Sequence, residues 1–314
     1  MRGNPVHSGV TGTGHIQRER TRTALRSADA GADASIPAVS AIVSHLQQLR
    51  AAVSEPDSAA EALGAVLIGG QNPAAMARAA GIAIAEEYAV LALALPPENP
   101  AHAEHVRTDA HRLTRIRRAV SATCGAGTLP LLGALGGTVL IPADDLDDPV
   151  PSALLVRLRQ AARGPVSMVA VPSLIDSIPQ STQLAHELLD VVHRLRYAPG
   201  MYRFEDLTLE YQLTRPGAAT EHLSRTLEPI VGHPDLVKTL RQHIDNNFHR
   251  QQTARALNIH SNTVDYRLRR VKDLTGLDPY RLTDLWHLQS ALVAHMYRHT
   301  DPESRHSDIA ATLD

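Results

Sequence analysis

The sequence predicts an α+β protein that is mostly helical, with a central sheet domain followed by an all-α C-terminal domain. The middle of the chain alternates short apolar runs, bounded by glycine and proline, with amphipathic segments. From Glu221 to Tyr297 the spacing of apolar residues is helical almost throughout. Apolar residues make up 43% of the 314 residues and charged residues 20%, which is typical of a folded soluble protein.

The N-terminal part divides into two predicted segments. Residues 1–35 are rich in Gly, Ser, Thr and Arg and lack apolar periodicity, which predicts a disordered tail. Residues 36–81 are predicted to be a helical segment. Ile36–Val53 has amphipathic spacing, and Ala59–Leu67 and Pro73–Ala80 are two further candidate helices separated by the turn sequence GGQN.

Residues 82–213 are predicted to form the sheet domain. The continuous apolar run Tyr88–Leu95 is typical of a buried strand, and Thr128–Asp145 indicates a strand, a glycine turn and a second strand. We expect a sheet with helices on one face. The other predicted elements are the helices His105–Cys124, Ser152–Ala162 and Thr182–Arg196 and the strands Val166–Ser173 and Met201–Leu213.

Charge is distributed unevenly along the chain. The formal net charge is −2. The segment from Leu236 to His299 has ten Lys and Arg against five Asp and Glu, a net charge of +5, which leaves −7 for the rest. A basic C-terminal module on an acidic body indicates that this module meets a polyanion.

Cysteine content and hydropathy exclude several classes of protein. Cys124 is the only cysteine, so intrachain disulfides and multi-cysteine zinc sites are excluded, and we interpret it as a core residue. No apolar run reaches the roughly 18 residues that a membrane helix needs, and the N-terminus lacks the apolar stretch of a signal peptide. We therefore expect a cytoplasmic protein with no membrane partner.

Residues 221–300 are predicted to contain a helix-turn-helix. Gln251–Leu257 is the first helix, and Asn258–His260 is the break, because asparagine tolerates a left-handed turn conformation. Ile259 can fill the angle between the two helices. Ser261 offers an N-cap oxygen to the second helix.

The second helix separates an apolar stripe from a polar face. Val264, Leu268 and Val271 are spaced four and then three residues apart, so they form the stripe. Asparagine can bond adenine and arginine can bond guanine or phosphate, so the opposite face suits a DNA groove. Arg267 and Lys272 flank the stripe and suit backbone phosphates. The residues predicted on the opposite face are Asn262, Tyr266, Arg269, Arg270 and Asp273.

A solvated helical hairpin whose arginines only improve solubility is the alternative, but the local excess of basic residues favours DNA. The stretch TARALNIHSNTVDYRLRRVKDLTGLDP resembles the C-terminal DNA-binding domain of the PucR/CdaR family of bacterial transcriptional regulators, a Fis-like helix-turn-helix. The similarity extends from about Leu236 to Leu292. The residues that carry it are Ala254, Ala256, Leu257, Asn262, Thr263, Tyr266, Arg267, Leu268, Arg270, Leu274, Thr275, Gly276 and Leu277.

The resemblance implies a set of DNA-binding residues near the start of the second helix. Ser261 stands where the family often has a basic residue, and Asp265 stands where a basic or polar residue is frequent. Because both lie near the presumed base-reading end, the operator does not follow by analogy. The DNA-binding residues so implied are Ser261, Asn262, Thr263, Asp265, Tyr266, Arg267, Arg269, Arg270 and Lys272.

The central domain resembles a degenerate nucleotide cyclase of the GGDEF type. Leu135–Pro142 falls where the signature hairpin of that family would be. A working cyclase needs carboxylates there to hold Mg²⁺, but Thr138 and Val139 follow the two turn glycines. The nearest acids, Glu98 and Asp144, are out of place. We expect no catalysis and no cofactor, and roles in dimerisation, effector sensing or scaffolding remain open.

The histidines form the remaining candidate sites. His102, His105 and His111 lie near Glu104, and His295 and His299 form a pair spaced by four residues. Neither group has the framework of a zinc site, so no metal site is predicted.

The sequence as a whole predicts a DNA-binding transcriptional regulator that is not an enzyme. Its partners would be double-stranded DNA, a second copy of the chain and, for the central domain, a small effector. Dimerisation is expected because one recognition helix covers only a few base pairs, and Thr182–Arg196 and Glu221–Asn246 are candidates for the contact. The alternatives are a protein-binding scaffold with a repurposed helix-turn-helix, or a cyclase-like enzyme.

Overall fold

The computed structural model describes residues 59–95, 106–125, 127–143 and 150–300. The predicted N-terminal tail, the flexible C-terminal tail predicted at residues 301–314 and the predicted helix Ile36–Val53 lie outside the described residues. The same is true of the candidate site residues Glu98, His102, Glu104, His105 and Asp144. The chain divides into two compact units, and the boundary falls between His186 and Glu187. No helix within the described ranges has both the length and the apolar character to cross a membrane.

The sheet of the first unit is built from the strands that the apolar runs predict. In this unit the strands lie in the order β2-β3-β1-β4, and each neighbouring pair is antiparallel. Their bounds are β1 Glu87–Ala94, β2 Leu129–Gly133, β3 Gly136–Pro142 and β4 Ser167–Leu174. β1 lies between β3 and β4, as its continuous apolar run predicts for a central strand.

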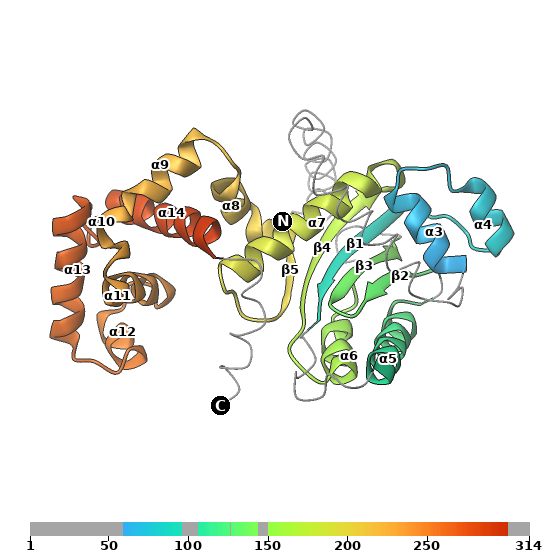
Figure 1. Ribbon diagram of the computed structural model, residues 1–314, viewed down its shortest axis with the longest axis horizontal. Helices are drawn as coiled ribbons and strands as arrows, with labels where there is room; N and C mark the ends of the chain where they lie inside the picture. Colours follow the sequence, from blue (N-terminus) through green and yellow to red (C-terminus); the bar gives the residue numbers. More distant parts are fainter. Residues whose placement is uncertain (1–58, 96–105, 126, 144–149, 301–314) are drawn as a thin grey trace, which may run out of the picture. The chain divides into compact units, whose positions relative to one another are not determined.

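Helices cover both faces of this sheet, so the prediction that they lie on one face is wrong. Six consecutive residues of β1 are buried, and successive side chains point to opposite faces, so both faces must be covered. Figure 1 shows α5 and α6 together on one side of the sheet. The bounds of the helices are α3 Ala59–Ile68, α4 Ala74–Ala80, α5 Val106–Cys124, α6 Ala153–Ala162 and α7 Ile178–Arg194.

α3 and the first half of α7 lie on the same face of the sheet, because each contacts a side chain of that face. Leu131 and Thr138 are cross-strand partners, and therefore their side chains share a face. A Cβ on Gly64 of α3 would meet the side chain of Leu131. The hydroxyl of Thr138 is hydrogen-bonded to Nε2 of His186 in α7, at 2.8 Å.

The two glycines predicted for the hairpin turn lie in β3, directly after the turn at residues 134–135, and packing requires them there. Gly136 and Gly137 have φ values of 127° and 152°. A Cβ on Gly136 would collide with the carbonyl of Leu93, and one on Gly137 with the carbonyl of Leu131. The pair therefore has a structural reason to be glycine, whether or not a nucleotide is bound nearby.

The segment Met201–Leu213 is mostly a helix, and the prediction of a strand there is wrong. Only Met201–Arg203 is extended, as β5, and α8 follows at Phe204–Thr214. The backbone N–H of Arg203 donates to the Asp206 carboxylate at 2.9 Å, which caps the helix at its start. The apolar residues of this segment alternate along the chain, but Leu209 is 53% exposed, so they do not form a strand's buried face.

The rest of the second unit is helical, as predicted. Its helices are α9 Ala218–Thr226, α10 Glu228–Val231, α11 Pro234–Asp245, α12 Arg250–Ala256, α13 Ser261–Thr275 and α14 Leu282–His299. They enclose one apolar core. The buried residues of this core are Leu227, Ile230, Leu236, Leu240, Ala254, Val264, Leu268, Val271, Leu288, Ala291 and Leu292.

Polar contacts attach the last two turns of α7 to this second unit. The Asp190 carboxylate accepts hydrogen bonds from Nε of Arg194, at 2.7 Å, and from the hydroxyl of Tyr297, at 3.2 Å. Nη1 of Arg194 donates to the Tyr297 carbonyl at 3.0 Å. The hydroxyl of Tyr211 donates to Glu187 at 2.6 Å. The end of α7 is thus held by α8 and α14.

Candidate nucleic-acid interface

α12 and α13 form the predicted helix-turn-helix. Asn258 has a φ of 52°, so it adopts the left-handed conformation expected at the break. Ile259 is partly buried against the apolar core and fills the angle between the helices, as predicted. α13 ends at Thr275, and its C-cap Gly276 has a φ of 75° and donates its N–H to the carbonyl of Lys272 at 2.8 Å.

The N-cap of α13 differs from the prediction. Ser261 is the first helical residue rather than the cap. Nδ1 of His260 accepts a hydrogen bond from the backbone N–H of Asn262 at 3.2 Å, so the histidine side chain caps the helix. Histidine is an uncommon N-cap residue, whereas serine is a preferred one. The sequence therefore predicts Ser261 as the cap and gives no sign of His260.

The buried and outward faces of α13 follow the predicted periodicity. Val264, Leu268 and Val271 are fully buried in the core of the unit. Among the residues that the structure describes, none forms an ion pair with Arg269 or Arg270. The outward side chains, all exposed, are those of Asn262, Tyr266, Arg269, Arg270 and Asp273.

Asp265, one of the departures from the family pattern, has partners in neighbouring elements. Its carboxylate accepts hydrogen bonds from Nη1 of Arg250, at 2.8 Å, and from the hydroxyl of Tyr280, at 3.0 Å. Burial, followed by the hydrogen bond to Asp265, raises the pKa of Tyr280 to about 12, so the tyrosine remains a neutral donor. Asp265 therefore joins α13 to the start of α12 and to the loop before α14.

Sequence reasoning did not identify Arg250 and Tyr280 as parts of this site. Both lie fifteen residues from Asp265 in sequence, one on each side. No local periodicity links residues so far apart, so no signal in the sequence could have found the pair. Of these three hydrogen-bonded residues, only Asp265 could be singled out from the sequence, because it departs from the family pattern.

Two of the basic residues predicted to meet phosphate are engaged within the unit. Nη1 of Arg267 donates to Thr239 at 3.2 Å, and its Nε lies 3.3 Å from the carboxylate of Asp235. Nζ of Lys272 donates to the Asp278 carboxylate at 2.7 Å. These contacts hold α13 against α11 and against the loop that follows it.

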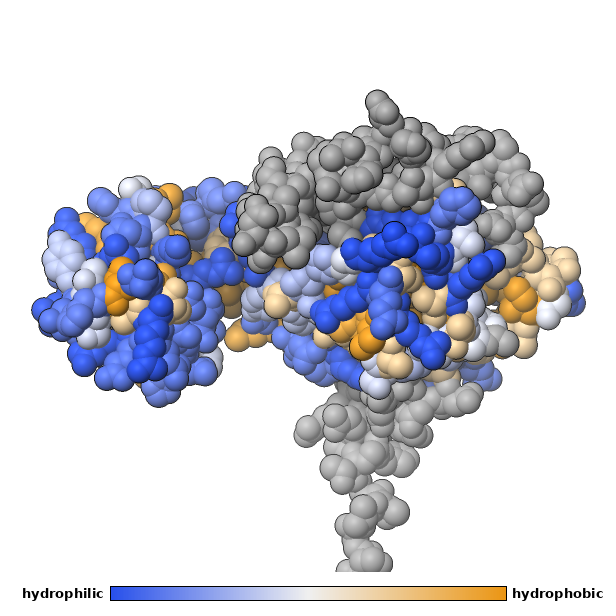
Figure 2. Space-filling view, turned by 90° about the horizontal axis from the view of Figure 1, so that it is seen from below, coloured by the Kyte–Doolittle hydropathy of each residue, from blue (hydrophilic) through white to orange (hydrophobic). Residues whose placement is uncertain are grey.

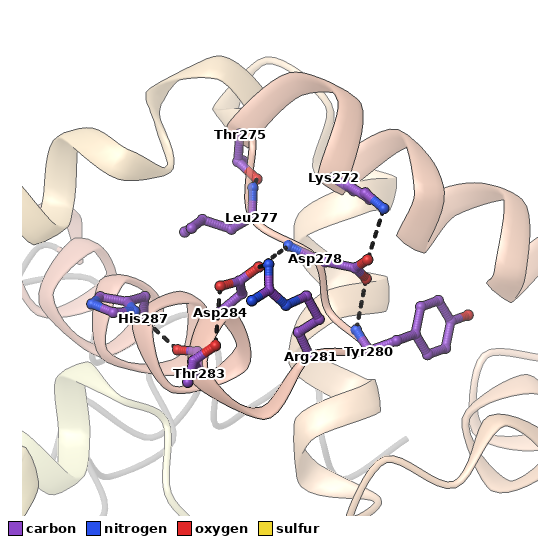
Figure 3. A network of polar contacts seen from close by, with 9 residues as sticks. All are labelled: Lys272, Thr275, Leu277, Asp278, Tyr280, Arg281, Thr283, Asp284 and His287. Carbon is purple, nitrogen blue, oxygen red and sulfur yellow. Dashed lines mark hydrogen bonds and ion pairs between the residues drawn. The ribbon is translucent and has the colours of Figure 1, made fainter.

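Figure 3 shows that Asp278 lies at the centre of this loop. Besides Lys272, its carboxylate accepts the backbone N–H of Tyr280 at 3.0 Å, and its own N–H donates to Asp284 of α14 at 3.0 Å. The hydrogen bond from Lys272 is the largest effect that lowers the pKa of Asp278. The loop thus joins the end of α13 to the first turn of α14.

Comparison with known proteins places this region in a family. The family model of the PucR C-terminal helix-turn-helix domain matches residues 236–294. The uncharacterized protein YsfB of Bacillus subtilis (strain 168) is 37% identical over 90 residues, which are 28% of this chain and 24% of that protein. The uncharacterized protein Rv2242 of Mycobacterium tuberculosis (strain ATCC 25618 / H37Rv) is 28% identical over 143 residues, 45% of this chain and 34% of that protein.

These matched segments span only about a quarter to a third of the relatives' own length. Among solved structures, a regulator of polyketide synthase expression from Bifidobacterium adolescentis aligns with a TM-score of 0.36 and 18% identity, over 81% of this chain and 98% of that one. The family model covers α11 to α14, the elements that build the helix-turn-helix. As the resemblance implied, residues 236–294 are a PucR C-terminal helix-turn-helix domain.

Proposed function

We propose that this chain is a sequence-specific DNA-binding transcriptional regulator that reads the major groove with α13. The observation that carries the proposal is the outward face of α13, where Asn262, Arg269 and Arg270 are exposed over a buried apolar stripe. Asparagine can form paired hydrogen bonds with adenine, and arginine with guanine. The net charge of +5 between Leu236 and His299 would favour approach to the phosphate backbone.

The nine predicted residues divide into two roles under this proposal. Asp265, Arg267 and Lys272 position α13, because their side chains are bonded to other elements of the unit. The others face the DNA. We assign base and phosphate contacts to Ser261, Asn262, Thr263, Tyr266, Arg269 and Arg270.

For residues 82–213 we propose a non-catalytic role in dimerisation or effector sensing, on a GGDEF-like scaffold. Val139 is fully buried and Thr138 is 5% exposed, so both signature positions lie in the core. Thr138 is also hydrogen-bonded to His186. Neither residue could hold Mg²⁺ against a triphosphate, and incubation with GTP and Mg²⁺ should therefore yield no product.

Replacement of two arginines tests the DNA-binding proposal. The double variant Arg269→Ala/Arg270→Ala should lose about 100-fold or more in affinity for its genomic target, because each arginine can contribute about 1–3 kcal/mol. Fluorescence anisotropy with a labelled operator duplex measures the affinity and, at saturation, the number of chains bound. The paired half-sites of a homodimer predict two chains for each duplex.

Arg298→Ala provides the matched control. Arg298 is also exposed in the second unit, but it lies in the last turn of α14. Its replacement should leave the affinity unchanged. Equal affinities of the double variant, the control and the wild type would show that α13 is not the reader.

A protein-binding scaffold is the second candidate. The first two turns of α14 expose two large apolar side chains, Leu282 at 69% and Trp286 at 60%, which is unusual for a surface without a partner. A scaffold would show no steep dependence of DNA affinity on salt, whereas a DNA-binding regulator releases counterions and loses affinity as salt rises. The same anisotropy measurement at several salt concentrations separates the two.

A further inference from the structure

A second surface rich in arginine lies on the first unit, far from α13 in sequence. α5 and α6 are bridged by a hydrogen bond from Nε of Arg115 to the carbonyl of Ala161, at 3.2 Å. Residues 110–124 and 150–165 together contain seven arginines and no acidic residue. Figure 2 looks onto this side of the unit and shows hydrophilic side chains gathered around a small hydrophobic area.

Five of these seven arginines fall into two groups. Arg115 and Arg117 serve the fold: Nη2 of Arg117 donates to Glu61 at 3.0 Å and to the carbonyl of Leu132 at 3.3 Å. Arg118, Arg157 and Arg163 are exposed, and within the described ranges no side chain forms an ion pair with any of them. We call these three residues the α5/α6 arginines.

Two features indicate that solvation of a helix face is not the whole explanation. Arg163 has a φ of 56°, in the left-handed region where a side chain costs about 1 kcal/mol or more, although Gly164 follows directly. A basic residue at the end of a helix is favoured by the helix dipole, but Arg118 and Arg157 lie before the last turns of their helices. The helix dipole therefore does not account for Arg118 and Arg157, and the backbone conformation does not favour an arginine at residue 163.

The chemistry of this surface suits phosphate rather than bases. Guanidinium groups bind phosphate oxygens in pairs, and a hydroxyl group such as that of the exposed Ser121 can add a further hydrogen bond. Neither helix inserts into a groove in this role, because phosphates line the outside of the duplex. A surface of this kind would add affinity and salt dependence without reading sequence.

We propose that the α5/α6 arginines bind the phosphate backbone of double-stranded DNA beyond the segment read by α13. This inference rests on the proposed function, because a helix-turn-helix bound to its operator raises the effective concentration of neighbouring DNA around the first unit. Four aspartates at residues 144–148 precede α6 in sequence, outside the described residues. These aspartates carry negative charge that could compete with DNA for the α5/α6 arginines. Measuring the DNA affinity of the full-length chain takes this competition into account.

Two duplexes carrying the same operator test the proposal with full-length protein. One duplex ends at the operator, and the other continues into flanking DNA to a total of roughly 60 base pairs, or six helical turns. The wild type should bind the long duplex more tightly and with a steeper salt dependence. In Arg118→Gln/Arg157→Gln/Arg163→Gln, the slope of log affinity against log salt on the long duplex should fall by up to about 2.7, that is, 0.9 for each phosphate contact.

The short duplex and a surface control complete the design. The triple variant should bind the short duplex like the wild type. Arg157→Gln alone should lower the long-duplex slope by about 0.9. Arg78→Gln should change neither duplex, because Arg78 is an exposed arginine of the first unit in α4, outside this surface. Circular dichroism and a melting curve establish that each variant folds.

The outcomes separate this inference from the proposed function. If the folded triple variant binds both duplexes like the wild type, the inference is overturned. Loss of binding to anionic phosphatidylglycerol vesicles in the same variant would not restore it, because the surface would then bind lipid phosphates rather than DNA. If Arg269→Ala/Arg270→Ala abolishes binding to both duplexes, the proposed function stands in either case. If that double variant binds the short duplex like the wild type, the proposed function fails.

Discussion

The exposed arginines of α13 and those of α5 and α6 make two positive surfaces of different composition. On α13 the arginines share the exposed face with Tyr266 and with Asn262, whose amide can distinguish one base from another. Among the described residues, the exposed face of α5 and α6 adds hydroxyl, amide, histidine and apolar side chains to its arginines, the last including Val156. Positive charge alone therefore does not identify a surface that reads DNA sequence. Whether a basic surface can do so depends on the side chains beside the arginines and on the contacts that hold them in place.

The two surfaces also differ in how firmly they are held. α13 is fixed on several sides, by Asp265 to α12, by Arg267 to α11 and by Lys272 to the following loop. Discrimination between bases needs side chains placed within a fraction of an ångström, which such anchoring provides. Phosphate binding tolerates more movement, because the charge acts over several ångströms.

The largest expected effect comes from removing the support beneath α13. Leu268→Ala should lower the free energy of unfolding of the second unit by about 2–5 kcal/mol, because it leaves a cavity at a fully buried position. Urea denaturation followed by circular dichroism measures the loss. Leu282→Ala is the control, since Leu282 is 69% exposed and should change stability by less than about 0.5 kcal/mol. Equal effects of the two changes would contradict the buried stripe.

A smaller effect is expected from pH, which acts on the stability of the folded units through their buried histidines. Burial lowers the pKa of His186 in the first unit to about 4. The unfolded histidine has a pKa near 6.5. The contribution of His186 to the free energy of unfolding is therefore fully present above pH 6.5, and it is lost as the pH decreases toward 4. The slope should approach about 1.4 kcal/mol for each pH unit, or roughly 3 kcal/mol in all.

Denaturation at pH 7, 6 and 5 measures this slope. His186→Gln should flatten it, since glutamine can keep a hydrogen bond to Thr138 without taking up a proton. His243 of the second unit also has a pKa lowered by burial, so part of the dependence should remain in the variant. An identical slope in variant and wild type would show that His186 is not the group responsible.

The smallest expected effect concerns specificity and most directly sharpens the comparison. Under the proposed function, Asn262→Ala should reduce the preference for the operator over a single-base variant by about 1–3 kcal/mol at the base that Asn262 is proposed to read. The triple variant of the α5/α6 arginines should keep that preference while losing affinity for long DNA. Competition binding with the two duplexes measures both quantities. A loss of preference in the triple variant would mean that the two surfaces do not differ as described.

Local patterns predicted much of the second unit and most strands of the first. The stripe of Val264, Leu268 and Val271 could be recognised because helical spacing places all three on one face whatever surrounds them. The break at Asn258 and Ile259 was predictable for the same reason, since backbone preference at a turn is a local property.

Errors arose where distant or competing contacts decide the outcome. Alternating apolar residues after Met201 indicate a strand, but the cap made by Arg203 and Asp206 starts a helix there instead. Ser261 has the residue type of an N-cap, yet the side chain of His260 takes that role. Each pattern was compatible with two local structures, and side-chain hydrogen bonds selected one.

The sequence by itself determined the periodicity of the helices, the central position of β1, the positive charge of the C-terminal module and its family. These properties depend on residues close together in the chain, so they survive without knowledge of the fold. Only the tertiary structure decided that Asp265 bonds Arg250 and Tyr280, that Thr138 is buried against His186, and that α5 and α6 present a common surface. Such contacts join residues far apart in sequence, because burial and hydrogen bonding are satisfied in space rather than along the chain.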